Sequence, residues 1–292
     1  MTRSTWIRRT CACRGARFRP WGLLGLLALG GLSCGTPSAD ASWADHDPTN
    51  TGRLDHSEWQ ALLDAYLITD DPSGVNLVDY AKLQASAADR GRLAGYIEYL
   101  QEQDPRQYAK DVQMAYWINL YNALTLQVMR DHYPVDSILD VDISPGLFSN
   151  GPWGAELIAV EGEVLTLDDI EHRILRPLWE DPRVHYAVNC ASIGCPNLQG
   201  RAWRAATLDA DLEAAATAFV NHDRGFTVDD GDLVVSSIYD WFIADFGGND
   251  EGVLRHLAQY ASPDRQAILQ SARRISDHRY DWALNDLAGA SP

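Results

Sequence analysis

Apolar residues occupy nearly every face of residues 111–135, DVQMAYWINLYNALTLQVMRDHYPV. A helix that is apolar all round is a buried one, so this segment predicts the central helix of the domain. Asn119 and Asn122 are three residues apart and therefore share one side of it. Because buried amides need hydrogen-bond partners, we expect the pair either to bind the backbone of packed loops or to line a polar pocket.

Two stretches have the pattern of β-hairpins. Residues 155–167 turn at Glu161-Gly162, and residues 226–237 turn at Asp230-Gly231. The run RVHYAVNC at 183–190 predicts a further strand, and the remaining periodic segments predict helices at 55–67, 89–103, 207–222, 238–247 and 250–261. The fold class that follows is a helix-rich, mixed α/β (α+β) single domain with a small, mainly antiparallel sheet.

A helix is also expected directly after the first hairpin, with Thr166 as its N-cap. Leu167, Ile170 and Ile174 form its apolar stripe. His172 lies on a different face, where an ordinary exposed or capping histidine competes with a functional one.

The N-terminus has the pattern of an export signal. Residues 1–20 carry six arginines and no acidic residue, and residues 21–33 are apolar or small. This run is shorter than the roughly 20 residues that a membrane-spanning helix needs. GLSCG at 31–35 resembles a bacterial lipobox, which implies that Cys34 is lipidated. We therefore expect a lipoprotein signal peptide at 1–33, an anchored flexible tether at 34–53, and one domain at 54–287.

Charge excludes some partners. The full chain has a net charge of -17, and loss of the six signal-peptide arginines makes the mature protein more acidic still. Such a field repels nucleic acid and anionic lipid headgroups, so we expect no nucleic-acid partner and a membrane contact through the lipid anchor alone. The sequence has no P-loop, dinucleotide-binding glycine run or Gly-x-Ser-x-Gly elbow, and we predict no cofactor.

Two cysteines, Cys190 and Cys195, remain in the mature domain once the signal is removed and Cys34 is lipidated. An exported pair favours a disulfide. The alternatives are a catalytic thiol at Cys190, reduced structural thiols, and a metal site, although the spacing is unlike that of a usual zinc knuckle.

A catalytic thiol needs a neighbouring base or positive group that lowers its pKa. On an unbroken strand His185 would face away from Cys190, five residues on, so His172 is the better candidate base. Asn189 or Asn119 would orient that base or stabilise an oxyanion.

Several motifs resemble, in order, those of the domain of unknown function 547 family: DHSEWQALL, VDYAKL, AYWINLYNALTL, LDDIEHRILR, HYAVNCASIGCP, YDWFIADFG and YDWALND. The resemblance extends from about Leu54 to Asn285. It implies family positions at Trp117, Asn119, Tyr121, Asn122, Glu171, His172, His185, Asn189, Cys190, Cys195, Pro196, Asp245 and Phe246.

The Cys, His and Asn residues in a mixed fold are also similar to those of papain-like and transglutaminase-like thiol enzymes. Those enzymes usually carry the cysteine at the start of the central helix, whereas both cysteines here follow the predicted strand. The resulting hypothesis is an exported, lipid-anchored protein of the cell envelope, at the outer membrane, with Cys190 acting on peptide, amide or ester groups of an envelope peptide or polymer. The alternative hypothesis is a non-catalytic binding or scaffold protein stiffened by a Cys190–Cys195 disulfide.

Overall fold

The computed structural model describes residues 41–146, 150–272 and 274–289. The expected signal peptide, Cys34 and the first part of the tether lie outside these described residues. All the described residues belong to one structural unit.

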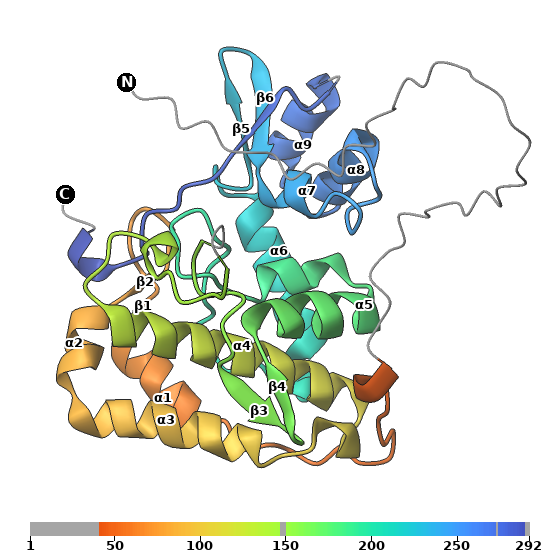
Figure 1. The fold of residues 1–292 in the computed structure, drawn as a ribbon. Coiled ribbons are helices and arrows are strands. Elements are labelled where there is room, and N and C mark those ends of the chain that lie inside the picture. Colours follow the sequence, from red (N-terminus) through yellow and green to blue (C-terminus); the bar gives the residue numbers. More distant parts are fainter. Residues whose placement is uncertain (1–40, 147–149, 273, 290–292) are drawn as a thin grey trace, which may run out of the picture. The chain divides into compact units, whose positions relative to one another are not determined.

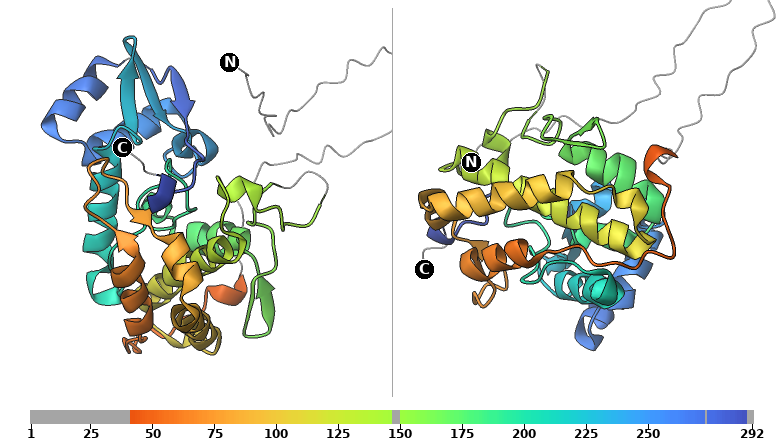
Figure 2. Two further views of the ribbon diagram at one scale, coloured as in Figure 1. Left: turned by 90° about the vertical axis from the view of Figure 1, so that its left-hand side faces the viewer. Right: turned by 90° about the horizontal axis from the view of Figure 1, so that it is seen from below.

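Helix α4 (Lys110–His132) is the centre of the fold, as the apolar pattern predicts. Every residue from Val112 to Leu126 is buried. Helices α2 (Tyr80–Ala85) and α3 (Ala87–Gln101) pack against α4, and α1 (Ser57–Tyr66) packs against α3 (Figure 1). The view from below in Figure 2 shows α1 and α3 side by side. The apolar surface of α4 is thus covered by these helices on one side and by later segments on the other.

Three small sheets replace the single expected sheet. Strands β1 (Leu67–Ile68) and β2 (Leu77–Val78) form one antiparallel pair, and β3 (Ile158–Val160) and β4 (Glu163–Leu165) form another. In the third sheet, β5 (Phe226–Asp229) pairs antiparallel with β6 (Asp232–Ser236), which pairs parallel with β7 (Asp277–Arg279). Both predicted hairpins are confirmed, and the fold is the predicted helix-rich α+β class.

The helix after β4 begins at the predicted cap. The Thr166 hydroxyl accepts the N–H of Asp169 at 3.0 Å, and the Asp169 carboxylate accepts the N–H of Thr166 at 3.0 Å. Residues Asp169–Leu175 are π-helical and continue into α5 (Arg176–Trp179). Leu167, Ile170 and Ile174 are fully buried, as their spacing predicts.

The strand expected at 183–190 is wrong. Pro182–Tyr186 form a 3-10 helix, and a loop follows it. The Asp181 carboxylate caps this helix by accepting the N–H of Arg183. Side-chain amides of Asn122 and Asn189 bond the backbone of this loop, and they take the place of a neighbouring strand. Helix α6 (Leu208–Val220) packs against the 3-10 helix.

The chain then forms α7 (Ile238–Trp241), α8 (Asp250–Tyr260) and α9 (Pro263–Ser271). After β7 the C-terminal segment runs back along the 191–194 loop. The N–H of Ile193 donates to the carbonyl of Ala283 and that of Gly194 to the carbonyl of Asp281, both at 2.8 Å. A side chain at Gly194 would lie 2.7 Å from the Asp281 nitrogen, so this close approach requires glycine.

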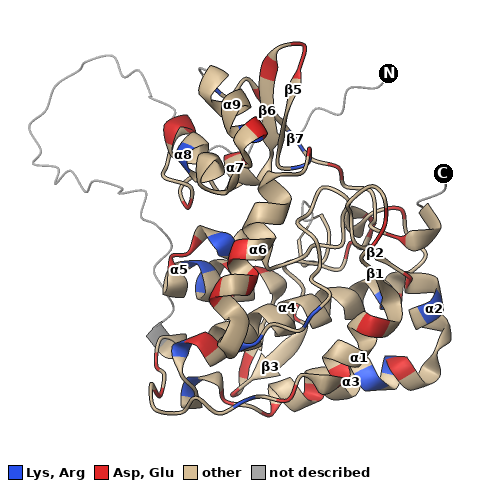
Figure 3. Cartoon of the chain, turned by 180° about the vertical axis from the view of Figure 1, so that it is seen from behind, with Lys and Arg blue, Asp and Glu red and all other residues tan. Residues whose placement is uncertain are grey.

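Acidic residues are spread over the described surface, with positions on the β5–β6 hairpin, α8, α1 and α3 (Figure 3). This distribution agrees with the net negative charge of the sequence. Within the described ranges, every helix is too short or too polar to cross a bilayer.

Candidate functional site

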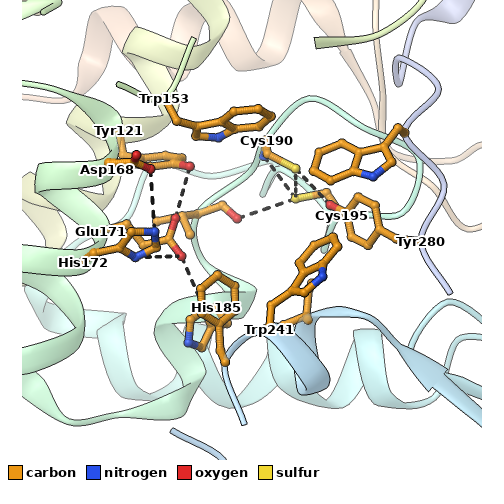
Figure 4. A pocket seen from close by; sticks show the side chains of 14 residues that line it. Tyr121, Trp153, Asp168, Glu171, His172, His185, Cys190, Cys195, Trp241 and Tyr280 are labelled. Atoms are coloured by element: carbon orange, nitrogen blue, oxygen red, sulfur yellow. Dashed lines mark hydrogen bonds and ion pairs between the residues drawn. The ribbon is translucent and has the colours of Figure 1, made fainter. Parts of the chain in front are cut away.

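A cavity of about 200 Å³ lies between the π-helical segment, the loop that carries both cysteines, α7 and the C-terminal segment. Figure 4 shows the cysteine pair and Tyr280 on one side of it, with Glu171 and His172 on the other. Aromatic rings form much of the remaining wall: Trp153, Trp241, Phe242, Tyr280 and Trp282.

The two cysteines are free thiols in contact with each other. Their sulfurs lie 3.1 Å apart, compared with about 2.05 Å in a disulfide. Both cysteines line the cavity, but Cys190 is half-buried, whereas Cys195 is only 4% exposed. The backbone N–H of Cys190 also donates to Cys195 Sγ at 3.1 Å.

Cys190 has two further polar partners. Ser192 Oγ lies 3.1 Å and Tyr280 Oη 2.9 Å from its sulfur. Ser192 Oγ also lies 2.9 Å from Tyr280 Oη, so the two hydroxyls and the sulfur form one hydrogen-bonded cluster. Among the described residues, neither His172 nor His185 is a hydrogen-bond partner of Cys190.

These contacts make the two thiols unequal. Hydrogen bonding from Cys195, aided by Ser192 and Tyr280, lowers the pKa of Cys190 in spite of its burial. Burial, together with the neighbouring Cys190, raises the pKa of Cys195 well above its ordinary value. The accessible sulfur is therefore the more acidic of the two, as a nucleophilic thiol requires.

Asn122 and Asn189 shape the loop rather than contact the sulfurs. Asn122 donates to the carbonyl of Ala187 at 2.9 Å and accepts the N–H of Asn189 at 2.8 Å. The Asn189 side chain donates to the carbonyl of Pro196 and accepts the N–H of Ala191. Ala191 has a φ of +58°, a left-handed conformation that costs energy for a residue with a side chain. The two amides hold this strained turn directly after Cys190.

Asn119 and Trp117 lie elsewhere. Asn119 exchanges two hydrogen bonds with the backbone of Trp203, at 2.8 and 3.0 Å, and does not line the cavity. Trp117 packs edge-on against Trp43 in the core. The expectation that buried amides bind loop backbone is correct for both asparagines of α4, and only Asn122 does so beside the cysteines.

The π-helical segment carries Glu171 and His172 to the cavity. Short π-helical stretches recur at functional sites because they alter which side chains share a helix face. The carboxylate of Glu171 accepts the Tyr121 hydroxyl at 3.3 Å. Burial alone would raise the pKa of Glu171, but the hydrogen bond and charge of His185, with nearby His172, lower it below its ordinary value.

His185 is buried between two carboxylates. Its Nε2 lies 2.7 Å from Asp245 and its Nδ1 lies 3.5 Å from Glu171. The ring stacks on Phe242 with centroids 4.2 Å apart and also contacts Phe246. Burial opposes the charged form, but Asp245 and Glu171 raise the pKa of His185 above its ordinary value. The two carboxylates thus favour the protonated ring, and His185 contacts Glu171 rather than the thiol.

His172 is held differently. Arg176 donates to its Nδ1 at 3.2 Å, so the proton of the neutral ring lies on Nε2, which faces Asp168 at 3.6 Å. Arg176 also makes a bidentate pair with Asp245, at 2.6 and 3.0 Å. Of the two predicted histidines, His172 is the more accessible from the cavity, with 35% of its side chain exposed.

Sequence reasoning missed most of the aromatic wall and the partners of the thiol. Tyr280 and Trp282 belong to the closing motif YDWALND, and Trp241 belongs to YDWFIADFG. Both motifs can be recognised in the sequence. The approach of Tyr280 to Cys190, however, depends on the C-terminal segment crossing the 191–194 loop. The described residues contain no group of three or more histidine, cysteine or acidic side chains that could hold a metal ion.

Residues 105–220 match the family model described as "Protein of unknown function, DUF547". This match supports the DUF547 family. The matched part contains both cysteines, Glu171, His172 and His185, whereas Asp245, Tyr280 and the last two tryptophans of the wall follow it. No curated protein and no solved structure matches the chain.

Proposed function

We propose that this DUF547 protein is a thiol-dependent enzyme that transfers or hydrolyses acyl groups, with Cys190 as the nucleophile. The observation that carries the proposal is the environment of Cys190. Its sulfur lines a cavity, has three polar partners at 2.9–3.1 Å, and has a lowered pKa beside a more basic, buried thiol. A thiolate stabilised by donors needs no base in direct contact before it attacks.

In the first step the Cys190 thiolate attacks the carbonyl carbon of a peptide, amide or ester. The bond from that carbon to the leaving nitrogen or oxygen breaks, and a thioester to Cys190 forms. The leaving group takes up the proton that Cys190 released on ionisation. In the second step water or an acceptor amine or alcohol attacks the thioester, gives up a proton and restores the Cys190 thiol.

His172 supplies an N–H donor in this scheme, directed at the oxygen that becomes negative when Cys190 attacks. It lines the same cavity as Cys190, and its Nε2–H is directed toward Asp168 rather than fixed in a short hydrogen bond. Glu171 lies beside it and is held by Tyr121 and His185. A donor that stabilises the oxyanion of acyl transfer must reach the reacting oxygen from the same cavity, and His172 meets that condition.

The site of action in this proposal is the cell envelope. The arginine-rich, apolar N-terminus and the GLSCG sequence support export and lipid attachment at Cys34. The substrate is then an envelope peptide or polymer. The non-catalytic alternative, a scaffold with a Cys190–Cys195 bridge, has one observation in its favour: sulfurs 3.1 Å apart need only a small shift to bond.

An activated ester tests the proposal. The purified protein, with its free thiols verified by titration, is incubated with p-nitrophenyl acetate and mapped by peptide mass spectrometry. We expect an acetyl group on Cys190 and none in Cys190→Ser protein of unchanged melting temperature. Absence of an adduct on Cys190 while its thiol is free, or acetylation of surface residues alone, would reject the enzyme proposal.

A further inference from the structure

The two carboxylates that line the cavity differ in how they are paired with basic groups. Asp168 and Glu171 contribute carboxylates, and none of the described residues lining the cavity is a lysine or arginine. Glu171 is paired with His185. The nearest basic group to the carboxylate of Asp168 is the ring of His172, 3.6 Å away, and 53% of the Asp168 side chain remains exposed. Partial burial raises the pKa of Asp168. The neighbouring Glu171 carboxylate adds to this rise, whereas His172 acts against it.

Indole rings form the facing wall. Trp241 stacks on Trp282 with centroids 5.5 Å apart, and Trp153 meets Trp282 edge-on at 5.7 Å. The backbone N–H of Asp168 donates to the carbonyl of Trp153 at 3.0 Å, so the main chains of these two residues are held side by side. Indole faces attract cations, and tryptophan does so most strongly among the aromatic residues. Carboxylates beside such faces select positive charge and reject negative charge.

We propose that this cavity binds the protonated amine of the substrate, between the tryptophan wall and Asp168. The substrate class is then an aminoacyl or amino-terminal peptidyl group, whose ammonium lies close to the carbonyl that Cys190 attacks. This inference rests on the proposed acyl chemistry for its substrate, whereas the ammonium site itself can be tested separately. A cavity of about 200 Å³ admits a group the size of one amino-acid residue, since one of about 150 Å³ already holds benzene.

Binding of two small amides tests the ammonium site without any reaction. Alaninamide carries an ammonium, and N-acetylalaninamide carries the same amide without the charge. Both are titrated against Cys190→Ser protein, and tryptophan fluorescence is recorded. We expect a saturable change with alaninamide and at least about tenfold weaker binding of the acetylated compound, because the attraction between two opposite charges near a protein surface is large enough to change binding tenfold or more.

Asp168→Asn identifies the group responsible. It keeps the size of the side chain and the backbone bond to Trp153, and we expect it to remove the preference for alaninamide. Asp70→Asn is the matched control, because Asp70 is exposed, lies outside the cavity and removes the same charge from the protein. No saturable binding of alaninamide, equal binding of the two amides, or a preference that survives Asp168→Asn would overturn the ammonium site.

The two proposals fail separately. If Cys190 forms an acetyl adduct from p-nitrophenyl acetate but the amides bind equally, the thiol chemistry stands and the ammonium site is wrong. If alaninamide binds selectively through Asp168 but no adduct forms on a free Cys190, the site binds amines and the enzyme proposal is wrong.

Discussion

Tyr280 Oη lies 2.9 Å from Cys190 Sγ, although ninety positions separate the two residues in the chain. The contact exists because the C-terminal segment pairs with the loop directly after Cys190. It makes the reactivity of the thiol depend on a part of the protein that lies outside the matched DUF547 segment.

Tyr280→Phe removes the phenolic donor and keeps the ring against Trp241 and Trp282. We expect the pKa of Cys190 to rise, since one of the groups that stabilise its thiolate is lost. Ultraviolet absorbance of the thiolate as a function of pH measures this change. An unaltered titration of Cys190 would show that Tyr280 packs against the sulfur without stabilising its charge.

Cys195→Ala removes the largest contribution to the lowered pKa of Cys190. We expect alkylation of Cys190 at neutral pH to slow several-fold, because a smaller fraction of the sulfur is ionised. Cys195→Ser retains a donor and should slow alkylation less. Equal rates in the two variants would contradict a donating role for Cys195.

His185→Gln tests the buried cluster of His185, Glu171 and Asp245. Removing one partner from a buried ion pair costs about 3–5 kcal/mol of unfolding free energy. His46→Gln, at an exposed position, is the control and should be close to neutral. Urea denaturation measures both. A loss below about 1 kcal/mol in His185→Gln would mean that the two carboxylates find other partners.

The same cluster predicts a pH dependence. The pKa of His185 is raised in the folded protein, so its stabilising effect is complete below the unfolded value of about 6.5 and is lost as the pH rises through the folded value. The pKa of Asp245 is lowered, so its effect is lost only at acidic pH. We expect wild-type stability to fall as the pH rises above about 6.5 and this fall to be smaller in His185→Gln. Parallel curves for the two proteins would contradict the assignment to His185.

The sequence predicts the parts of the fold that depend on local pattern. The all-round apolar run identified α4, Gly162 and Gly231 identified the hairpin turns, and Thr166 identified a helix start. The strand at 183–190 failed because Asn122 and Asn189, rather than a second strand, bond its backbone. The argument from strand faces that ranked His172 over His185 as the base rested on that strand, and both histidines line the cavity.

The site could be predicted only in part, because its residues come from distant segments. The motifs identified Cys190, Cys195, Glu171 and His172, which the fold brings to one cavity. No periodicity indicates that Trp153 and Trp282 meet, or that Asp168 rather than Glu171 lacks a close cationic partner. Those relationships arise from the path of the C-terminal segment and from the π-helical turn.

The two central asparagines offer a paired test of how the loop is held. Asn122→Leu leaves the carbonyl of Ala187 and the N–H of Asn189 unpaired, so we expect a loss of about 1–3 kcal/mol and altered alkylation of Cys190. Asn119→Leu should cost a similar amount but leave the alkylation rate unchanged, because its partner is Trp203. Equal effects on Cys190 from both changes would contradict the separation of the two roles.

Cys34→Ala tests the proposed lipid anchor. We expect the wild-type protein in the membrane fraction of cells and the variant in the soluble fraction, since removing the acylated cysteine removes the attachment. A wild-type protein found soluble, with residues before Cys34 still attached, would reject the lipoprotein proposal.

The pH dependence of Cys190 alkylation tests the central claim most directly. The purified protein is treated with iodoacetamide across a pH series, and modification of each cysteine is followed by peptide mass spectrometry. The structure predicts that Cys190 reacts first, with a midpoint below the value of about 8.5 of an ordinary cysteine, and that Cys195 reacts only at much higher pH. A midpoint for Cys190 at or above that of Cys195, or a Cys190–Cys195 bridge that blocks alkylation until reductant is added, would contradict the account.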